Sequence, residues 1–194
     1  MANVIQLSGK KRAGKDTIAN MFKTSLESYG KSVEVMAFAE PLKDIVATIL
    51  GITKEQLDVM KNNTDTYKIK IPMLNHITDT RTLLQKMGTE ASKKWFGDNV
   101  WVNLLKDRIS TSDADYIIIT DTRFICEVLS EALTIRVNSN MTNSLDIHPS
   151  ETELDDYEFN ITITNNDYSI EQQDIDKIVS DLMYIEAFAE QLNK

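Results

Sequence analysis

The feature that most constrains the fold is a glycine loop placed between a predicted strand and a predicted helix. The apolar run NVIQLS (3–8) leads into GKKRAGKDT (9–17), and residues 15–29 then carry apolar side chains at helical spacing. Glycines in such a loop let backbone N–H groups turn inward as a nest for anionic oxygens, beside the positive end of the helix. A glycine turn without a ligand is the alternative, but this order of elements predicts a phosphate-binding loop.

The loop departs from the usual pattern G-x-x-x-x-G-K-[ST] at one position. Asp16 stands where Ser or Thr is usual, and Thr17 follows one residue later. A carboxylate is a hard oxygen ligand, so we assign a Mg²⁺ contact to Asp16, because one residue of helix turns Thr17 away by about 100°. The alternative for Asp16 is helix capping. The residues predicted to contact nucleotide phosphates are Gly9, Lys10, Lys11, Arg12, Ala13, Gly14, Lys15, Asp16 and Thr17.

The rest of the chain alternates predicted strands with predicted helices. Strands are expected at 3–8, 32–39, 115–120, 133–137 and 160–164. Helices are expected at 15–29, 41–50, 54–60 after the capping residue Thr53, 81–96, 100–109, 124–132 and 170–192, with a surface loop at 62–78. This alternation predicts an α/β protein with the three-layer P-loop NTPase fold, in which helices flank a parallel five-stranded sheet in one domain of residues 1–194.

Charge and composition exclude some classes of function. The net charge is −9, and residues 137–176 hold ten acidic residues and neither Lys nor Arg, which argues against a polynucleotide-binding surface. No signal peptide and no membrane helix are expected from the apolar runs. The single cysteine, Cys126, rules out an intramolecular disulfide and indicates a reducing cytoplasm; we expect it to be a buried packing residue.

A second carboxylate ends the most apolar run, DYIIIT (115–120), at Asp121. An apolar strand that ends in Asp is a usual companion of a phosphate loop, where the acid holds Mg²⁺ or its water shell. Arg123 follows two residues later and either braces Asp121 or clamps a phosphate bidentately. The end of this strand is therefore predicted to face the glycine loop.

Six blocks spread over nearly the whole chain resemble bacteriophage deoxynucleoside monophosphate kinases. The blocks are LSGKKRAGKDT (7–17), FAEPLKD (38–44), RTLLQKMGTE (81–90), Trp101-Val102, ITDTRFICE (119–127) and ITITNN (161–166). The resemblance implies transfer of the ATP γ-phosphoryl group to a deoxynucleoside monophosphate (dNMP), with Mg²⁺ as cofactor, ATP and dNMP as small-molecule partners, and the host cytoplasm as location. It also implies a dNMP-binding helical region at about 40–110 and a lid-like segment at about 138–159.

Three residues of the third block share one face of a predicted helix. Arg81, Gln85 and Gly88 fall at i, i+4 and i+7, which places them on one side of a helix. The arginine is suited to hold a monophosphate and the glutamine a base edge, and Gly88 allows backbone or ligand to approach closely. The alternative is a capped amphipathic helix with a solvated arginine. The dNMP contacts predicted with the help of the resemblance are Phe38, Arg81, Gln85, Trp101, Arg123 and Glu127.

Several of these assignments have alternatives. Trp101 and Phe38 either stack on a base or pack in the core. Glu127 either orients Arg123 or reaches the sugar or base. On the resemblance, Asn165 and Arg136 are the candidate adenine contacts.

The predicted lid segment is acidic, which bears on the transition state. After Arg136 the next basic residue is Lys177. We therefore assign the transition-state charge to Lys15, Arg12, Arg123, Arg81 and Mg²⁺ in place of a basic lid, with catalytic roles for Lys15, Arg123, Asp121 and Arg12. In the acidic segment, Ser150 or Thr152 is expected to cap a short helix and the acids to form a solvated face; the alternative is that His148 or Glu151 approaches the nucleotide.

Two other functions fit parts of the sequence. Dephospho-coenzyme A and phosphomevalonate kinases share parts of the first two blocks, and a non-catalytic ATP-binding module would need only the loop. The closing helix either packs on the sheet or supports a homodimer.

Overall fold

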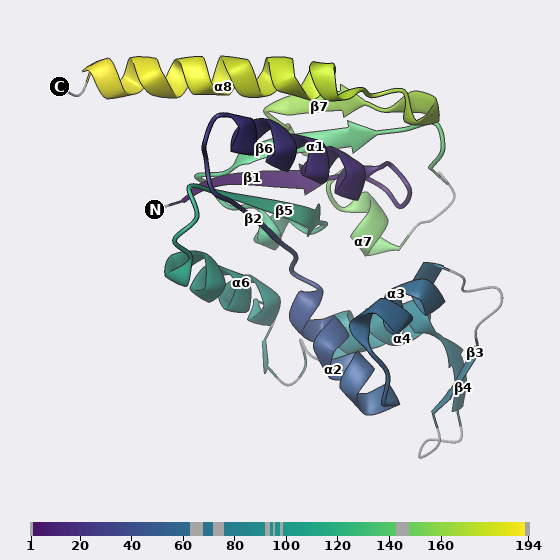
Figure 1. The fold of residues 1–194 in the computed structure, drawn as a ribbon. Helices are drawn as coiled ribbons and strands as arrows, with labels where there is room; N and C mark the ends of the chain where they lie inside the picture. The colour runs from purple at the N-terminus through teal and green to yellow at the C-terminus, as the bar shows by residue number, and fades with distance from the viewer. Residues whose placement is uncertain are drawn as a thin grey trace. The chain divides into compact units, whose positions relative to one another are not determined.

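The computed structural model of the chain describes residues 2–62, 68–71, 76–91, 94, 96–97, 99–142 and 148–192. These residues divide into two compact units (Figure 1). The first unit comprises Met1–Ala37 and Arg108–Lys194, and the second comprises Phe38–Asp107. The second unit nearly coincides with the region 40–110 for which dNMP binding is predicted, and that role stays a prediction.

The first unit contains a five-stranded sheet in which every neighbouring pair is parallel. Its strands are β1 (Asn3–Ser8), β2 (Val33–Met36), β5 (Tyr116–Thr122), β6 (Leu133–Asn138) and β7 (Ile161–Thr164), in the order β2-β5-β1-β6-β7. The predicted α/β class with a parallel five-stranded sheet flanked by helices is confirmed. Successive strands are added to one side of β1 and then to the other, so the loop after β1 lies at a switch point, where ligands of such sheets bind.

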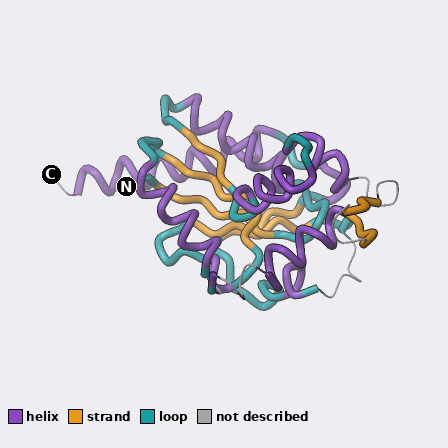
Figure 2. The backbone as a smooth tube through the Cα atoms, turned by 90° about the horizontal axis from the view of Figure 1, so that it is seen from below, coloured by secondary structure: helices purple, strands orange, loops and turns teal. Residues whose placement is uncertain are grey.

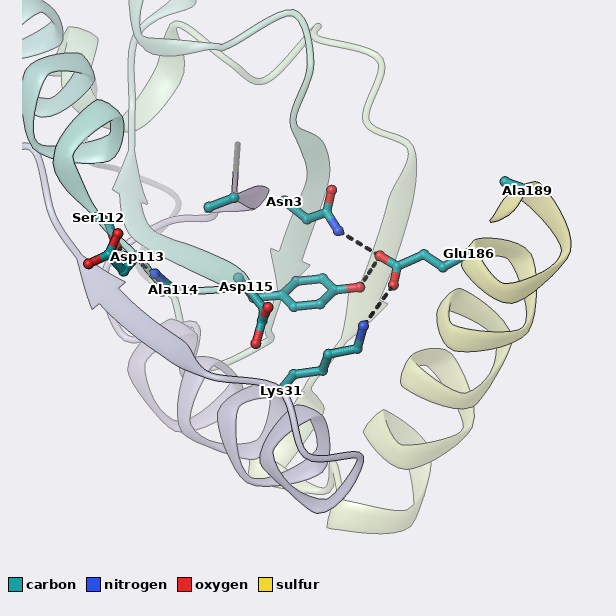
Figure 3. A pocket seen from close by; sticks show the side chains of 10 residues that line it. Asn3, Lys31, Ser112, Asp113, Ala114, Asp115, Glu186 and Ala189 are labelled. Carbon is teal, nitrogen blue, oxygen red and sulfur yellow. Dashed lines mark hydrogen bonds and ion pairs between the residues drawn. The ribbon is translucent and has the colours of Figure 1, made fainter. Parts of the chain in front are cut away.

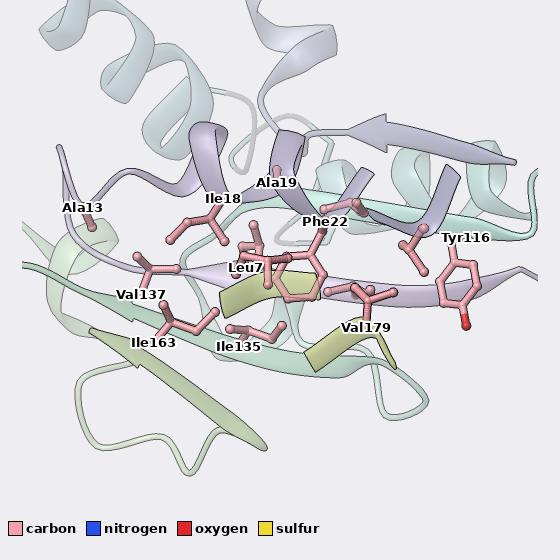
Figure 4. Packing of buried hydrophobic residues seen from close by; sticks show 14 residues of the cluster. Leu7, Ala13, Ile18, Ala19, Phe22, Tyr116, Ile135, Val137, Ile163 and Val179 are labelled. Carbon is pink, nitrogen blue, oxygen red and sulfur yellow. The ribbon is translucent and has the colours of Figure 1, made fainter. Parts of the chain in front are cut away.

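One face of this sheet is covered by α1 (Lys15–Ser28) and α8 (Gln172–Leu192). Ile18, Phe22 and Leu26 recur one turn apart on α1 and are fully buried, and the strand residues of the same cluster are buried with them (Figure 4). Each large side chain buried in this way contributes roughly 1.5–3 kcal/mol. This core fixes the start of α1, and with it the glycine loop, against the carboxyl end of β1.

The closing helix runs on past the sheet (Figures 1 and 2). Ile175 and Val179 are buried against α1 and the sheet, whereas Tyr184, Ile185 and Phe188 near the end of the helix are exposed. The predicted packing of this helix on the sheet is therefore confirmed for its first half. A homodimer through the second half stays a prediction.

The second unit is built from helices and a small hairpin. Its elements are α2 (Glu40–Leu50), α3 (Lys54–Asn62), β3 (Lys68–Ile71), β4 (His76–Asp79), α4 (Thr80–Gln85), the π-helix η1 (Lys86–Ala91) and most of α6 (Val100–Thr111), which continues into the first unit. Thr53 caps α3 as predicted, through reciprocal hydrogen bonds with Gln56 of 2.9 and 3.2 Å. Leu42, Val46 and Leu57 lie in its core.

Three predicted elements are wrong. The loop at 62–78 contains an antiparallel pair of strands, in which Lys68 lies opposite Asp79. The helix at 81–96 is not a continuous α-helix, because η1 replaces it from Lys86; residues 92, 93 and 95 of that prediction lie outside the described part. The helix at 124–132 is only a 3₁₀ turn, η2 (Ile125–Glu127).

Two further expectations concern the burial of Cys126 and membrane-spanning helices. Cys126 is exposed, so its prediction as a buried packing residue is wrong. Among the described residues, none of the helices is long and apolar enough to span a bilayer.

Candidate phosphate-binding site

The glycine loop has the backbone geometry that its sequence predicts. Gly14 is the N-cap of α1 with φ of 90°, and Arg12 also has a positive φ, of 67°, although it carries a side chain. A Cβ atom at residue 14 would lie 2.4 Å from Nδ2 of Asn165, so glycine is required there by space as well as by conformation. Left-handed residues in a loop before a helix favour the arrangement that forms an anion-binding nest.

Lys15 lies in the mouth of this loop. Its ammonium donates hydrogen bonds to the carbonyl oxygens of Gly9 at 2.7 Å and Lys10 at 3.0 Å. Burial, and next the charge of Arg123, lower the pKa of Lys15 to about 8, while the charges of Glu151, Asp16 and Asp121 oppose that shift. The structure therefore brings the loop lysine within electrostatic range of Arg123 and of both predicted metal ligands.

Two side chains of the segment after β7 form hydrogen bonds with the backbone of the glycine loop. The amide of Asn165, whose residue is only 3% exposed, donates from Nδ2 to the carbonyl of Ala13 at 3.0 Å and accepts the N–H of Ile170 at 3.3 Å. The hydroxyl of Tyr168 donates to the carbonyl of Arg12 at 3.4 Å. These bonds hold two loop carbonyls away from the nest. Adenine contact by Asn165 stays a prediction.

The end of β5 is braced by Glu127. Its carboxylate accepts the backbone N–H groups of Arg123 at 2.7 Å and Phe124 at 3.1 Å, and the residue is 6% exposed. Burial, with the charge of Asp121, raises the pKa of Glu127 to about 8. Of the two alternatives for Glu127, the structure displays the positioning of Arg123 through its backbone, whereas a contact to sugar or base stays a prediction.

Glu151 was expected in a solvated acidic face, with an approach to the nucleotide as the alternative, and it lies at this site. One of its carboxylate oxygens pairs with the guanidinium of Arg123, and the other accepts the backbone N–H of Lys11 at 2.8 Å. Burial alone would raise the pKa of Glu151, but Arg123 and the Lys11 N–H together lower it. The expected solvated acidic face is therefore wrong for Glu151, whose side chain is 2% exposed.

Glu151 lies on the short helix α7 (Pro149–Thr152), and its cap also differs from the expectation. The imidazole of His148 accepts the N–H of Ser150 at 3.2 Å, so His148 is the N-cap where Ser150 or Thr152 was expected. The carbonyl of Ser150 accepts a further hydrogen bond from Arg123 at 3.0 Å. The start of α7 is thus joined to the end of β5.

Beside the loop, Asp155 joins two cations. It pairs with Lys10 at 3.1 Å and with Arg136 at 2.5 Å, and the Arg136 guanidinium lies 5.6 Å from the centre of the Phe159 ring. A pocket of about 720 Å³ is lined by Lys10, Arg136, Asn138, Asp155, Tyr157, Glu158, Phe159 and Thr162. The adenine contact predicted for Arg136 stays a prediction.

A second pocket, of about 560 Å³, lies at the opposite, amino end of the strands (Figure 3). Glu186 of α8 makes three contacts in this pocket. Its carboxylate accepts hydrogen bonds from Asn3 at 2.7 Å and from the Tyr116 hydroxyl, and it forms an ion pair with Lys31 at 3.6 Å. These bonds tie α8 to the starts of β1 and β5, so this pocket is separate from the loop.

Of the predicted acceptor residues, Phe38, Arg81, Gln85 and Trp101 lie in the second unit, whereas Arg123 and Glu127 lie in the first. The indole N–H of Trp101 donates to the carbonyl of Gly88 at 2.8 Å, and its ring packs against the cluster that contains Leu42. A Cβ atom on Gly88 would lie 2.6 Å from Leu42, so the close approach there is made by a core side chain. Phe38 is buried. Base stacking by either aromatic residue stays a prediction.

The predicted shared face of Arg81, Gln85 and Gly88 is altered by the π-helix. A π-helix bonds i to i+5, so residues beyond Lys86 are rotated away from the positions of an α-helix. Arg81 and Gln85 keep their one-turn spacing within α4. The side chain of Arg81 lies outside the described part of the structure, and its role stays a prediction.

Comparisons with known proteins agree with the motifs. The chain is similar to the deoxynucleotide monophosphate kinase of Escherichia phage RB69, with 36% identity over 110 residues, which are 51% of this chain and 44% of that protein. The match thus spans less than half the length of that relative. No family model matches the chain.

Solved structures offer a more distant comparison. Cobyrinic acid a,c-diamide synthase from Mycobacterium smegmatis, crystallised with magnesium and either ADP or an ATP analogue, superposes with a TM-score of 0.44 and 13% identity over 93% of this chain and 82% of that one. The resemblance to phage deoxynucleoside monophosphate kinases predicted from the sequence is confirmed by the RB69 kinase over the matched stretch.

Proposed function

We propose that this chain is a Mg²⁺-dependent kinase that transfers the γ-phosphoryl group of ATP to a deoxynucleoside monophosphate. The observation that carries the proposal is the glycine loop at the switch point of the sheet, where the charges of Arg123, Asp16 and Asp121 act on Lys15. The similarity to a kinase of this specificity supports the choice of acceptor.

The residues around the loop fit ATP and Mg²⁺. The loop N–H groups and Lys15 would bind the phosphates, and Asp16 and Asp121 would hold the ion, because the charges of both carboxylates act on the same lysine. Among the described residues no cluster of three or more His, Cys, Asp or Glu side chains is arranged to hold a metal. Mg²⁺ suits this arrangement, since it is usually held by one or two carboxylates together with substrate phosphates. When bound, the ion neutralises charge on the β- and γ-phosphates.

The transfer itself needs positioning and positive charge. A phosphate oxygen of the dNMP attacks the γ-phosphorus, the bond from that phosphorus to the β-phosphate oxygen breaks, and ADP leaves. Lys15, Arg12 and Arg123 would meet the charge on the transferring group. Phe38, Arg81, Gln85 and Trp101 would hold the acceptor, with Arg123 and Glu127 at the end of β5.

A coupled assay of ADP release tests this function. We expect ADP release to depend on a dNMP, and to be lost in Lys15→Ala. Dephospho-coenzyme A and ribonucleoside monophosphates serve as competing acceptors. Turnover with dephospho-coenzyme A alone would replace the proposed acceptor, and ATP binding without acceptor-dependent turnover would indicate a binding module.

A further inference from the structure

We propose that Glu151 is an internal competitor for the phosphate site, which the phosphates of an incoming nucleotide displace. The inference rests on the proposed function of the glycine loop as a nucleotide site. It concerns donors that Glu151 engages and that phosphate oxygens would also need: the guanidinium of Arg123 and the N–H of Lys11.

The geometry of Glu151 resembles that of a bound anion. Both carboxylate oxygens are engaged, one by a guanidinium and the other by a loop N–H, which are two of the donor types that bind phosphate in proteins. The side chain is 2% exposed, so these bonds are shielded from water. A carboxylate held in this way occupies a place for which a phosphate oxygen is equally suited.

The charges around Glu151 make joint occupancy unfavourable. The Glu151 carboxylate acts on Lys15 and Arg123, the cations proposed to bind phosphate. A phosphate at these cations would face the carboxylate at short range, and two anions sharing one buried site repel each other strongly. Because the phosphates of ATP carry more charge than one carboxylate, they take the donors and Glu151 leaves.

The segment makes other contacts as well: Glu153 accepts the N–H of Ile125 at 2.9 Å, and Leu154 is buried. Asp155 pairs with Lys10, but these side chains are 35% and 24% exposed, and partly exposed ion pairs contribute little to stability. Glu151 by contrast bonds the glycine loop from a buried position, through the N–H of Lys11. Loss of the Glu151 contacts is expected to loosen residues 148–153 while the loop itself becomes ordered around the phosphates.

Calorimetry with inorganic tripolyphosphate, a base-free probe of the phosphate site, tests the proposal on the full chain. Glu151→Gln keeps the shape of the side chain and removes its charge. We expect it to bind tripolyphosphate at least about tenfold more tightly than the wild type, because a charge-assisted hydrogen bond is strong enough to shift an equilibrium by that factor. The matched control is Asp156→Asn, an exposed acid of the same segment, which is expected to bind like the wild type.

Hydrogen–deuterium exchange on the wild type gives a second measurement that needs no variant. Adding tripolyphosphate should slow exchange at residues 9–16 and speed it at 148–153. Slower exchange in both segments would show that α7 closes on the ligand and would overturn the competitor role, as would equal or weaker binding by Glu151→Gln.

The outcomes separate this inference from the proposed function. Tighter binding by Glu151→Gln without dNMP-dependent ADP release leaves the competitor in place and removes the kinase. Absence of tripolyphosphate binding in both the wild type and Glu151→Gln overturns the competitor and the phosphate site together.

Discussion

The side-chain amide of Asn165 donates a hydrogen bond to the backbone carbonyl of Ala13, 152 residues earlier in the chain, at 3.0 Å. The bond joins the residue that follows β7, the last strand in the chain, to the glycine loop that precedes α1. Because Asn165 is buried, its amide cannot exchange this partner for water without cost. The shape of the loop thus depends on a residue that belongs to the far end of the sequence.

Replacement of Asn165 by alanine should lower both stability and nucleotide affinity. Removing the amide leaves the Ala13 carbonyl without this donor, for which we expect a loss of about 1–3 kcal/mol in the free energy of unfolding. Urea unfolding and the KM for ATP measure the two effects. Thr164→Ala, at an exposed position one residue before, is the control and should change stability by less than about 0.5 kcal/mol. Equal losses in the two variants would contradict the role of Asn165.

The effect of an arginine-to-alanine substitution on kcat should depend on where the arginine lies. Arg12→Ala and Arg123→Ala are expected to lower kcat by about 10²-fold or more, because they remove charge from the transferring phosphoryl group. Arg136 is paired with Asp155 and lies over Phe159, so Arg136→Ala should lower kcat by less than about tenfold. Steady-state kinetics at saturating substrate measures these effects. A collapse of turnover in Arg136→Ala alone would contradict the assignment.

The metal assignment predicts a difference between neighbouring loop residues. Asp16→Asn and Asp121→Asn should raise the Mg²⁺ concentration needed for half-maximal turnover, since each removes a charged oxygen ligand. Thr17→Val should leave that concentration unchanged. Titration of turnover with Mg²⁺ after treatment with a chelator compares them. A shift in Thr17→Val without one in Asp16→Asn would move the metal contact to Thr17.

Glu127 should make stability fall as pH rises. Its folded-state pKa of about 8 lies above its ordinary value of 4.5, so the folded protein holds a proton there that the unfolded chain releases. The proton stabilises the fold fully below about pH 4.5, and this contribution is lost as pH rises through about 8. Urea unfolding without Mg²⁺ should therefore show the wild type losing stability relative to Glu127→Gln between pH 5 and pH 8.

The amide of Glu127→Gln can still accept the N–H groups of Arg123 and Phe124, so the variant isolates the titration from the positioning. Glu131→Gln, an exposed acid of the following turn, is the matched control. A constant stability difference between wild type and Glu127→Gln across this pH range would show that Glu127 is ionised throughout.

Local sequence patterns predicted much of the fold. The run NVIQLS forms β1 over residues 3–8 as predicted, and the apolar DYIIIT forms most of the interior strand β5, because continuous apolar runs are typical of strands buried on both faces. The glycine loop was predictable for the same reason, since its spacing and its neighbours are all local.

Predictions failed where contacts between residues far apart in the sequence determine the local structure. The segment after Arg123 has a helical apolar pattern, but the side chain of Gln6 on β1 donates to the carbonyl of Glu127 at 2.9 Å and accepts the N–H of Leu129 at 2.8 Å, and only a 3₁₀ turn forms. Glu151 sits among exposed acids in sequence, and only its pairing with Lys11 and Arg123 makes it buried. A contact between residues so far apart in the sequence leaves no periodic pattern of apolar residues.

Transfer of label from [γ-³²P]ATP to an added dNMP tests the central claim most directly. We expect labelled deoxynucleoside diphosphate with the wild type, and none with Lys15→Ala. Label that stays in ATP or appears only as inorganic phosphate, with a dNMP present at saturating concentration, would contradict it.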